Sequence, residues 1–383
     1  MKTDLKNHKF IVLCEDHYNP LTLVRSLAMD GLDPVVVLAG EKPYLITASR
    51  YARNLIRVKT IEEGLEYIWN NYSAESKKPF LYSCSDDVAT LLDANYSRLK
   101  DHFYFFNGGA DAQIVEYLDK ETILKAAEEC GISVPLSVRV PLGHCPDNIS
   151  YPVITKSIKS TVGGWKNDVF ICNDKAELTE AFKKIQSDPV LIEEFIKKEN
   201  ELCVDGISFN GGEYVYMPFK VNYLRFTDKA YGNFMVVNIF DDDELKAKIT
   251  KLFRKTKFSG IFSIEFLITK TGSLKFLEIN FRHSTWALSS KKGGANLPVI
   301  WAESMLSGKP ETEGITLSSE PFTAMSELAD FNEHVRHGNL SLWQWLKDFH
   351  NCPCTFIYDK SDRKPFFATI CFSFKQLFKK YIG

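Results

Sequence analysis

The hydrophobic pattern of the first third of the chain predicts alternating strands and helices. Continuous apolar runs, which are typical of buried strands, occur at residues 10–14, 34–38, 80–83 and 103–106. Residues 21–29 have helical spacing, and a second helix is expected to end near residue 99. Because strands that alternate with helices favour a parallel sheet, we predict a small doubly wound α/β unit over residues 1–117.

Polar residues follow two of these predicted strands. The loops at residues 15–18 and 83–87 would lie at the carboxyl ends of the strands, where such sheets bind ligands. Helix caps and turns account for the same residues, so a binding role and a structural role both remain open. No G-x-G-x-x-G follows the first strand, and the dinucleotide-binding fingerprint is therefore absent.

The middle of the chain combines two lysines with a glycine-containing turn. Lys120 opens a predicted helix, and Lys156 ends an apolar β-run. Gly163 and Gly164 lie between Lys156 and a second short β-run at residues 169–171. A strand, a glycine turn and a returning strand form a flap whose backbone N–H groups can cover phosphates. Because a lysine ammonium suits a phosphate oxygen, we predict an anion-binding flap here.

An acidic β-run follows the flap. Residues 190–196 include Glu193 and Glu194, and Glu201 comes shortly after them. An exposed edge strand would show the same pattern, so these residues alone do not distinguish a binding segment from an edge.

Residues 261–282 carry the most specific signal in the chain. Two apolar runs, IFSIEFLI and LKFLEINF, flank a short polar Thr-Lys-Thr-Gly-Ser connection, which predicts a β-hairpin. A turn centred between Thr271 and Gly272 places Glu265 directly opposite Glu278.

The facing glutamates suggest a metal site, because two carboxylates opposite each other destabilise an antiparallel pair unless a cation lies between them. Side chains alternate along a strand, so Glu278, Asn280 and Arg282 share one face. Leu277, Ile279 and Phe281 are expected on the other face. Two carboxylates and an amide oxygen suit Mg²⁺, which completes its shell with water and phosphate. A solvated hairpin face with ordinary charges is the alternative interpretation.

Four further residues are candidates whose roles the pattern leaves open. Lys220 and Arg225 are the basic residues nearest to the predicted phosphate site, although each could equally be a solvated charge. His283 and Ser284 continue from the hairpin into the predicted site. His283 is a candidate ligand or base, and a positioning hydrogen bond is the alternative.

Two segments are candidate anion or metal sites. Gly293 and Gly294 precede a predicted helix at residues 297–306, and glycines at a helix N-terminus make a natural anion site. The acidic run at residues 241–244 resembles a metal cluster, but acids favour the first turn of a helix, so we predict a helix cap there.

Composition narrows the function classes. Hydrophobic residues make up 45% of the chain, charged residues 25%, and the formal net charge is −2, so no bulk positive charge points to nucleic acid. The nine cysteines show no metal-ligand spacing, which favours free thiols in a cytoplasmic protein. No apolar run is long enough for a transmembrane segment. The basic amphipathic segment at residues 372–381 is expected to pack on the protein, with a membrane surface as the alternative.

The hairpin motif resembles that of a known family. E-x-N-x-R on a strand, with a second Glu one strand earlier, resembles the metal site of the ATP-grasp enzymes. The D-K-(x)4-K-(x)5-G-I-x-V-P segment from Asp119 resembles the entry into that domain. The resemblance implies an α/β fold with a pre-ATP-grasp Rossmann-like unit and a two-lobed α+β ATP-grasp domain. The implied bounds are 1–117 for the first unit, 118–308 for the ATP-grasp domain with a lid at about 135–190, and 309–383 for a C-terminal extension.

The resemblance also implies roles for individual residues. The residues that would bind ATP are Lys120 and Lys156, the flap glycines Gly163 and Gly164, the hinge residues Glu193, Glu194, Phe195 and Ile196, and Glu201 at the ribose. Glu265, Glu278 and Asn280 would hold Mg²⁺ or Mn²⁺. Arg282 and Lys220 would be catalytic, and Arg225, His283, Ser284, Gly293 and Gly294 would face the substrate.

The segment EINFRHSTW…GGANLPVIW is most similar to ligases of the peptidoglycan D-aspartate ligase type. This implies an ATP-dependent carboxylate–amine (or thiol) ligase that forms an acylphosphate and releases ADP and phosphate. Small carboxylates and amines are the implied substrates, while a cell-wall or glycan precursor and a homodimer stay open. Two alternatives remain: an ATP-grasp enzyme with a non-amine acceptor, such as a kinase or carboxylating enzyme, and a non-catalytic nucleotide-binding module.

Overall fold

The computed structural model describes residues 2–158, 165–227 and 230–382. The chain begins with a five-stranded parallel sheet in the order β3-β2-β1-β4-β5. Its strands are β1 (Phe10–Glu15), β2 (Pro34–Ala39), β3 (Asn54–Val58), β4 (Phe80–Ser83) and β5 (Tyr104–Phe105). Its helical segments are α1 (Lys2–Leu5), α2 (Tyr18–Ala28), η1 (Ile46–Ala48), α3 (Ile61–Tyr72), α4 (Asp86–Ala94), α5 (Tyr96–Leu99) and α6 (Gln113–Tyr117). The predicted parallel α/β unit is confirmed.

Two details of this unit differ from the sequence prediction. Strand β3 and helix α3 lie between the second and third predicted strands. The β3 sequence NLIRV is short, polar at two positions and mostly accessible to solvent, so it lacks the continuous apolar run of a central strand. Helix α2 begins at Tyr18 rather than Leu21, because the side chain of His17 caps it by accepting a hydrogen bond from the Asn19 amide.

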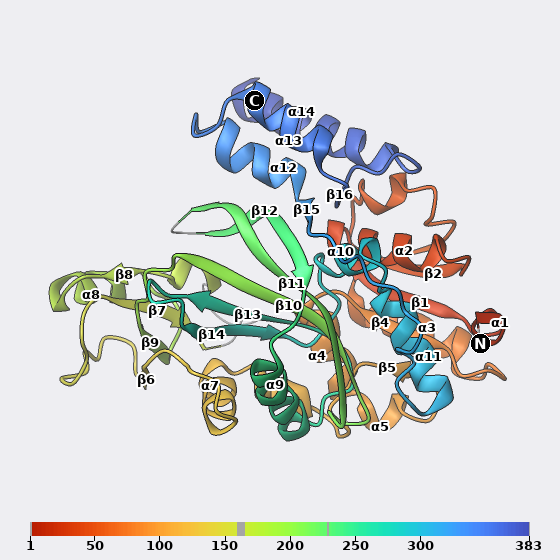
Figure 1. The fold of residues 1–383 in the computed structure, drawn as a ribbon, viewed down its shortest axis with the longest axis horizontal. Coiled ribbons are helices and arrows are strands. Elements are labelled where there is room, and N and C mark those ends of the chain that lie inside the picture. The colour runs from red at the N-terminus through yellow and green to blue at the C-terminus, as the bar shows by residue number, and fades with distance from the viewer. Residues whose placement is uncertain (1, 159–164, 228–229, 383) are drawn as a thin grey trace.

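A small four-stranded sheet, the lid sheet, forms the lobe at the left of Figure 1. Its order is β6 (Ser137–Val140), β9 (Val190–Glu194), β7 (Val153–Ser157) and β8 (Ile171–Cys172). Helix α7 (Lys120–Glu129) leads into it, and η2 (Trp165–Asp168) and α8 (Lys175–Phe182) belong to it. The lid sheet has its own core, in which Val153, Leu178 and Ile192 are buried.

A seven-stranded sheet fills the centre of the molecule in the order β14-β13-β10-β11-β12-β15-β16. Its strands are β10 (Asn200–Phe209), β11 (Tyr214–Thr227), β12 (Ala230–Ile239), β13 (Gly260–Ile268), β14 (Leu274–Asn280), β15 (Phe322–Met325) and β16 (Cys354–Thr355). Helices α9 (Asp243–Thr256), α10 (Ala287–Lys292) and α11 (Leu297–Ser307) accompany it. The predicted cap at residues 241–244 is confirmed, since Asp242 accepts the Leu245 amide at the start of α9.

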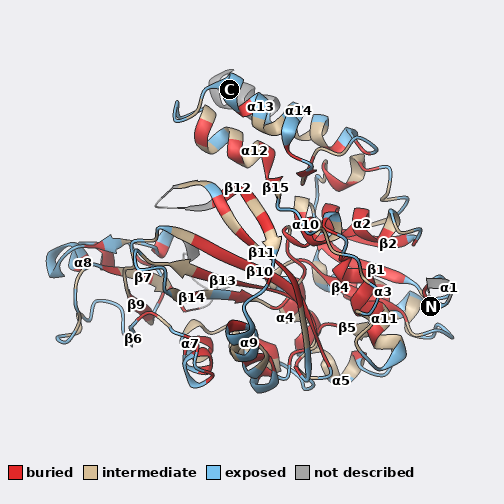
Figure 2. Ribbon diagram, viewed as in Figure 1, coloured by how far each residue is buried: buried red, intermediate tan, exposed pale blue. Residues whose placement is uncertain are grey.

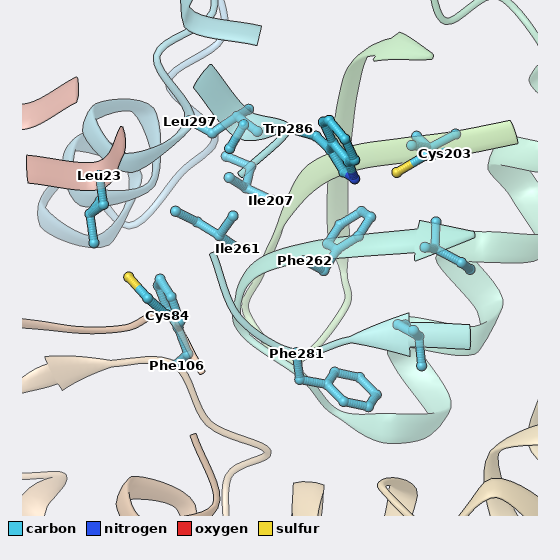
Figure 3. Close-up of a cluster of buried hydrophobic side chains, with 14 of the residues drawn as sticks. Leu23, Cys84, Phe106, Cys203, Ile207, Ile261, Phe262, Phe281, Trp286 and Leu297 are labelled. Carbon is cyan, nitrogen blue, oxygen red and sulfur yellow. The ribbon is translucent and has the colours of Figure 1, made fainter. Parts of the chain in front are cut away.

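One continuous core joins the parallel unit to the seven-stranded sheet. Figure 3 shows Leu23 of α2 and Phe106 near Ile207, Ile261 and Leu297. The buried residues in Figure 2 run through both sheets, whereas the outer helix faces are exposed. The loops at the ends of β1 and β4 are therefore held rigidly against the central sheet.

The C-terminal segment from Glu327 onward packs on both units in its described part. It forms α12 (Glu327–Asp330), the π-helical turn η3 (Phe331–Val335), α13 (Leu342–Asn351) and α14 (Lys364–Ile382), at the top of Figure 1. Phe372 of α14 stacks on Tyr44 with ring centroids 4.0 Å apart, so the helix packs on the protein at this position. The side chains of residues 374–381, which make up most of the predicted amphipathic segment, lie outside the described residues, so that prediction stays open. No helix in the described part of the chain is long and apolar enough to cross a membrane.

Candidate active site

The β13–β14 hairpin has the predicted pairing at its centre. Glu265 is directly opposite Glu278, and Ser263 is opposite Asn280. The turn lies half a residue earlier than predicted: the Thr269 amide donates to the Ser273 carbonyl at 2.9 Å, which leaves a three-residue loop.

A β-bulge between the turn and the glutamates restores the predicted register. On the turn side Phe266 pairs with Phe276, whereas beyond the bulge Glu265 pairs with Glu278. Leu277 is the extra residue and is half-buried, so Phe276 rather than Leu277 joins Ile279 in the core. The bulge therefore compensates for the shifted turn, and the glutamates face each other as expected.

The two facing glutamates destabilise each other's charged form, although the positive charge of Arg282 partly offsets this effect at Glu265. Burial, followed by the charges of Glu278 and Glu201, raises the pKa of Glu265 well above its ordinary value. In the described part of the chain, Glu265 has no hydrogen-bond or ion-pair partner. A divalent cation between the carboxylates would remove this repulsion.

The donor set fits a hard cation that keeps several outside ligands. No group of three or more His, Cys, Asp or Glu side chains in the described residues is placed to hold a metal. Glu265, Glu278 and Asn280 instead line one cavity, where the two carboxylates and the amide oxygen of Asn280, which here accepts from Arg282, would supply a partial shell of oxygen donors. Mg²⁺ accepts such a shell, because water and phosphate oxygens complete its octahedron.

Arg282 lies beside these donors and is held at two nitrogens. Its Nε donates to Oδ1 of Asp86 at 2.7 Å, and its Nη2 donates to Oδ1 of Asn280 at 2.9 Å. Asp86 is the first residue of α4, so the parallel unit reaches directly into the hairpin site.

The two predicted phosphate lysines lie side by side. Nζ of Lys120 donates to the Ser157 carbonyl at 2.8 Å, and Nζ of Lys156 lies 2.5 Å from Oε1 of Glu193. Burial and the neighbouring charge of Lys156 lower the pKa of Lys120, while Glu278 raises it. The structure thus places Lys120 beside Lys156 and close enough to Glu278 for their charges to interact.

The hinge segment connects the lid sheet to the central sheet. The amide of Phe195 donates to the Pro152 carbonyl at 3.1 Å, so this group is already hydrogen-bonded. Glu201 follows at the start of β10, where its Oε1 lies 2.5 Å from Nζ of Lys198. Burial raises the pKa of Glu201, and Glu278 adds to the shift, which places Glu201 near the metal donors.

A cavity of about 920 Å³ opens beside the hairpin and is shared by both units. Its lining from the central sheet and the following loop includes Tyr223, Glu265, Glu278, Asn280, Arg282, Ser284, Thr285 and Trp286. Its lining from the parallel unit is residues 14–20 and 84–87. These two loops follow β1 and β4, which are neighbours at the point where the strand order reverses, the usual ligand crevice of such sheets.

The loop residues combine the structural and the lining role that the sequence left open. Asp16 accepts the amides of residues 44–46, and Ser85 caps α4 by accepting the Val88 amide at 3.3 Å. Glu15 and Asp87 are exposed, and burial followed by the Asp87 charge raises the pKa of Glu15. Both loops were predicted without a choice of individual residues. The signal was an acidic pair near the end of each strand, Glu15-Asp16 at the end of β1 and Asp86-Asp87 at the start of α4.

Comparison with known proteins agrees with this geometry. Residues 126–289 match the family model of the ATP-grasp domain. This chain carries an ATP-grasp domain. An N5-carboxyaminoimidazole ribonucleotide synthase of Staphylococcus aureus is 24% identical over 163 residues, which are 42% of this chain and 42% of that relative. The ATP-grasp fold thus contains the lid sheet and most of the central sheet.

Solved structures share the fold over most of the chain. The ADP complex of an N5-carboxyaminoimidazole synthetase from S. aureus has a TM-score of 0.65 at 16% identity, and 86% of each chain is covered. An L-amino acid ligase from Bacillus licheniformis has a TM-score of 0.60 at 14% identity, with 79% of this chain and 74% of that chain covered. At these identities the likeness establishes the fold.

Two basic residues predicted for the ATP-grasp site lie elsewhere. Lys220 pairs with Val204 in the sheet, whereas Glu265 pairs with Cys203, so Lys220 points to the opposite face, where its partner is Asp241. Arg225 binds Asp330 through Nε at 3.2 Å and Nη2 at 2.7 Å, and Nη1 binds Asp348 at 2.7 Å. Arg225 therefore anchors the C-terminal helices and does not contact the cavity.

His283 and Ser284 have different surroundings. His283 is fully buried, and burial lowers its pKa to about 3, which makes it neutral and supports the positioning alternative. Its Nδ1 lies 2.9 Å from Oδ1 of Asn19. Ser284 lines the cavity and donates to Oδ1 of the buried Asp205 at 2.8 Å.

The glycine anion site is not formed. Gly293 and Gly294 end α10, and their amides donate to the carbonyls of Ser289 and Lys291 at 2.9 and 3.0 Å. These N–H groups close one helix rather than open the next, so they are not free to bind an anion. The predicted flap glycines, Gly163 and Gly164, lie outside the described residues.

Proposed function

We propose that this chain is an ATP-dependent ligase that joins a small carboxylate to an amine through an acylphosphate, releasing ADP and phosphate. The observation that carries the proposal is the facing Glu265–Glu278 pair, with Asn280 and Arg282 beside it in one large cavity. This donor set serves phosphoryl transfer, which needs alignment and charge neutralisation more than covalent help.

Each part of the site has a role in this chemistry. Glu265, Glu278 and Asn280 would hold Mg²⁺, which neutralises phosphate charge when bound. Lys120 and Lys156 would bind phosphate oxygens. The lid sheet would exclude water that otherwise hydrolyses an acylphosphate.

Arg282 suits the second half of the reaction. A carboxylate is a poor electrophile. Transfer of the γ-phosphoryl group of ATP to one of its oxygens releases ADP and forms an acylphosphate, from which phosphate can leave. The amine then attacks the acyl carbon, negative charge builds on the carbonyl oxygen, and phosphate departs. A guanidinium with a remaining N–H can stabilise that charge.

The charge of the cavity favours a cationic acceptor. Six carboxylates line it, from Glu15, Asp16, Asp86, Asp87, Glu265 and Glu278. Among the described lining residues Arg282 is the one lysine or arginine, and Asp86 already binds it. The relatives named ribonucleotide synthases form, by name, a ribonucleotide, which is a phosphorylated compound. A wall this acidic would repel such an acceptor and attract an amine that arrives as an ammonium ion.

The experiment measures both half-reactions. Purified full-length protein would be incubated with Mg-ATP and a panel of amino acids and small carboxylates, and ADP release would identify the activated acid. Hydroxylamine would trap the acylphosphate as a hydroxamate, and mass spectrometry with amines present would identify the amide.

Glu278→Gln is the matched inactive variant, because it removes a charge and keeps the shape. We expect loss of ADP release with an unchanged circular dichroism spectrum. A phosphorylated acceptor, or turnover that requires bicarbonate and yields no amide, would contradict the ligase and support the kinase or carboxylating alternative. Full activity of folded Glu278→Gln would remove the hairpin from the mechanism.

A further inference from the structure

The guanidinium of Arg282 is held across the boundary between the parallel unit and the central sheet. Asp86 accepts a hydrogen bond from Nε, and Asn280 accepts one from Nη2. Nη1 has no hydrogen-bond partner in the described part of the chain. The Asp86 and Arg282 side chains are 25% and 19% exposed, so water screens this ion pair only partly. One nitrogen is thereby left for a ligand while the other two fix the plane of the group.

The backbone beside Arg282 is attached to the same loop that carries Asp86. The His283 amide donates to the Ser83 carbonyl at 3.2 Å. Nδ2 of Asn19 donates both to the His283 carbonyl and to the Cys84 carbonyl, each at 2.8 Å. These bonds hold the end of β14 against the β4–α4 loop, so the distance between Asp86 and Arg282 is set by the fold.

Helix formation does not account for the choice of aspartate at position 86. Ser85 already caps α4, and Asp86 and Asp87 both add favourable negative charge to its first turn. Asp87 is exposed and has no hydrogen bond or ion pair among the described residues. Asp86 and Asp87 therefore both stabilise the N-terminus of α4, but only Asp86 of these two contacts Arg282.

Asp86 competes with the metal carboxylates for the guanidinium. The charges of Asp86 and Glu278 both act on Arg282, and no ion pair between Glu265 or Glu278 and a lysine or arginine is formed among the described residues. If Asp86 lost its charge, the guanidinium would be drawn toward the glutamate pair. It would then occupy the place in which a divalent cation belongs.

We propose that Asp86 is a positioning residue that holds Arg282 beside the Glu265–Glu278 pair and keeps its guanidinium off those carboxylates. The inference rests on the proposed function in assigning Arg282 to the reaction. It adds that the parallel unit completes the site of the ATP-grasp domain through one ion pair.

The test is a Mn²⁺ titration of the full-length protein with ATP present, followed by electron paramagnetic resonance. Asp86→Asn should weaken Mn²⁺ binding about 10-fold or more, the scale found for residues that orient metal ligands. Asp87→Asn, which removes the same charge from the same turn, should change Mn²⁺ affinity by less than about twofold.

A double variant separates competition from general damage. Adding Arg282→Met to Asp86→Asn removes the competing guanidinium and should restore most of the Mn²⁺ affinity. In ligation assays, Asp86→Asn should lower kcat about 10- to 100-fold and raise the Mg²⁺ concentration needed for half-maximal rate. Wild-type Mn²⁺ affinity in Asp86→Asn, or no recovery in the double variant, would overturn the inference. If the wild-type protein ligates no substrate, the proposed function fails, and the Mn²⁺ titration still decides the role of Asp86.

Discussion

Burial decides the behaviour of single charged residues around the cavity. Burial raises the pKa of Glu265 and raises that of Asp205 to about 7, whereas it lowers the pKa of His283 to about 3. Each shift favours the neutral form of the group. A cation at the site would favour the ionised form of Glu265, while His283 is a neutral hydrogen-bonding residue and is unsuited to act as a base.

The pKa of His283 predicts a pH-dependent stability. A histidine whose folded pKa is depressed stabilises the fold above its unfolded pKa, near 6.5, and this contribution is lost as pH falls toward 3. Between pH 7.5 and pH 5 the loss is about 2 kcal/mol. Urea unfolding at both pH values should show that the free energy of unfolding falls less between pH 7.5 and pH 5 in His283→Asn than in wild type.

Two comparisons keep this test specific to His283. Asp205 has a raised pKa and therefore stabilises the fold as pH falls through 7. This contribution is present in both proteins, so the effect of His283 is the difference between wild type and variant in how the free energy of unfolding changes with pH. His337 is exposed, and His337→Asn should keep the wild-type pH dependence. If the free energy of unfolding fell equally in wild type and His283→Asn, His283 would not be a buried, neutral histidine.

At the scale of elements, the lid sheet ties phosphate binding to local stability. Lys156 on β7 and Glu193 on β9 form an ion pair with side chains 16% and 5% exposed. The lysine that would bind ATP therefore also compensates a buried carboxylate. A change at Lys156 acts on both properties.

Lys156→Ala is expected to weaken ATP binding about 10-fold, since a charged hydrogen bond contributes about 1.5–3 kcal/mol. It should also lower the free energy of unfolding by about 1–3 kcal/mol, because Glu193 is left unpaired. In Lys156→Ala/Glu193→Gln the stability should recover, while ATP affinity measured by calorimetry should stay low. Wild-type ATP affinity in either variant would place Lys156 outside the nucleotide site.

At the scale of the whole molecule, the C-terminal segment is part of the scaffold rather than an appended tail. β15 pairs with β12 in the central sheet. Arg25 of α2 binds Asp362 at 3.0 Å, with both side chains 1% exposed. Arg225 of β11 holds Asp330, which is fully buried. The segment thereby joins the parallel unit to the ATP-grasp domain, and its helices lie above the central sheet at the top of Figure 1.

Arg225→Met should destabilise the whole chain, because it leaves Asp330 buried without its cation. Breaking such a pair costs about 3 kcal/mol or more. Arg98→Met is the matched control, because Arg98 also makes two hydrogen bonds to one carboxylate, that of Glu66, but on the surface. Arg98→Met should therefore lower the free energy of unfolding much less than Arg225→Met. Urea unfolding measures both. Equal losses in the two variants would mean that Asp330 is compensated in another way.

Local sequence was sufficient for features that depend on neighbouring residues. The strand period of two and the polar turn put Glu265 opposite Glu278, and a half-residue error in the turn was cancelled by the bulge at Leu277. Asp119 and Asp242 cap helices through amides two or three residues away. Such interactions span a few residues and leave a pattern in the sequence.

Side-chain partners from distant segments depended on how the two sheets pack. Asp86 meets Arg282, and Arg225 meets Asp330, across more than 100 residues of chain. Lys220 was predicted in the site because the sequence shows a basic residue on a predicted strand. The side of the sheet from which Lys220 projects is set by the pairing of β11 with β10. A strand's sequence shows which residues share a face; which face meets the cavity is determined by the core that both sheets bury, since burying apolar area drives their packing.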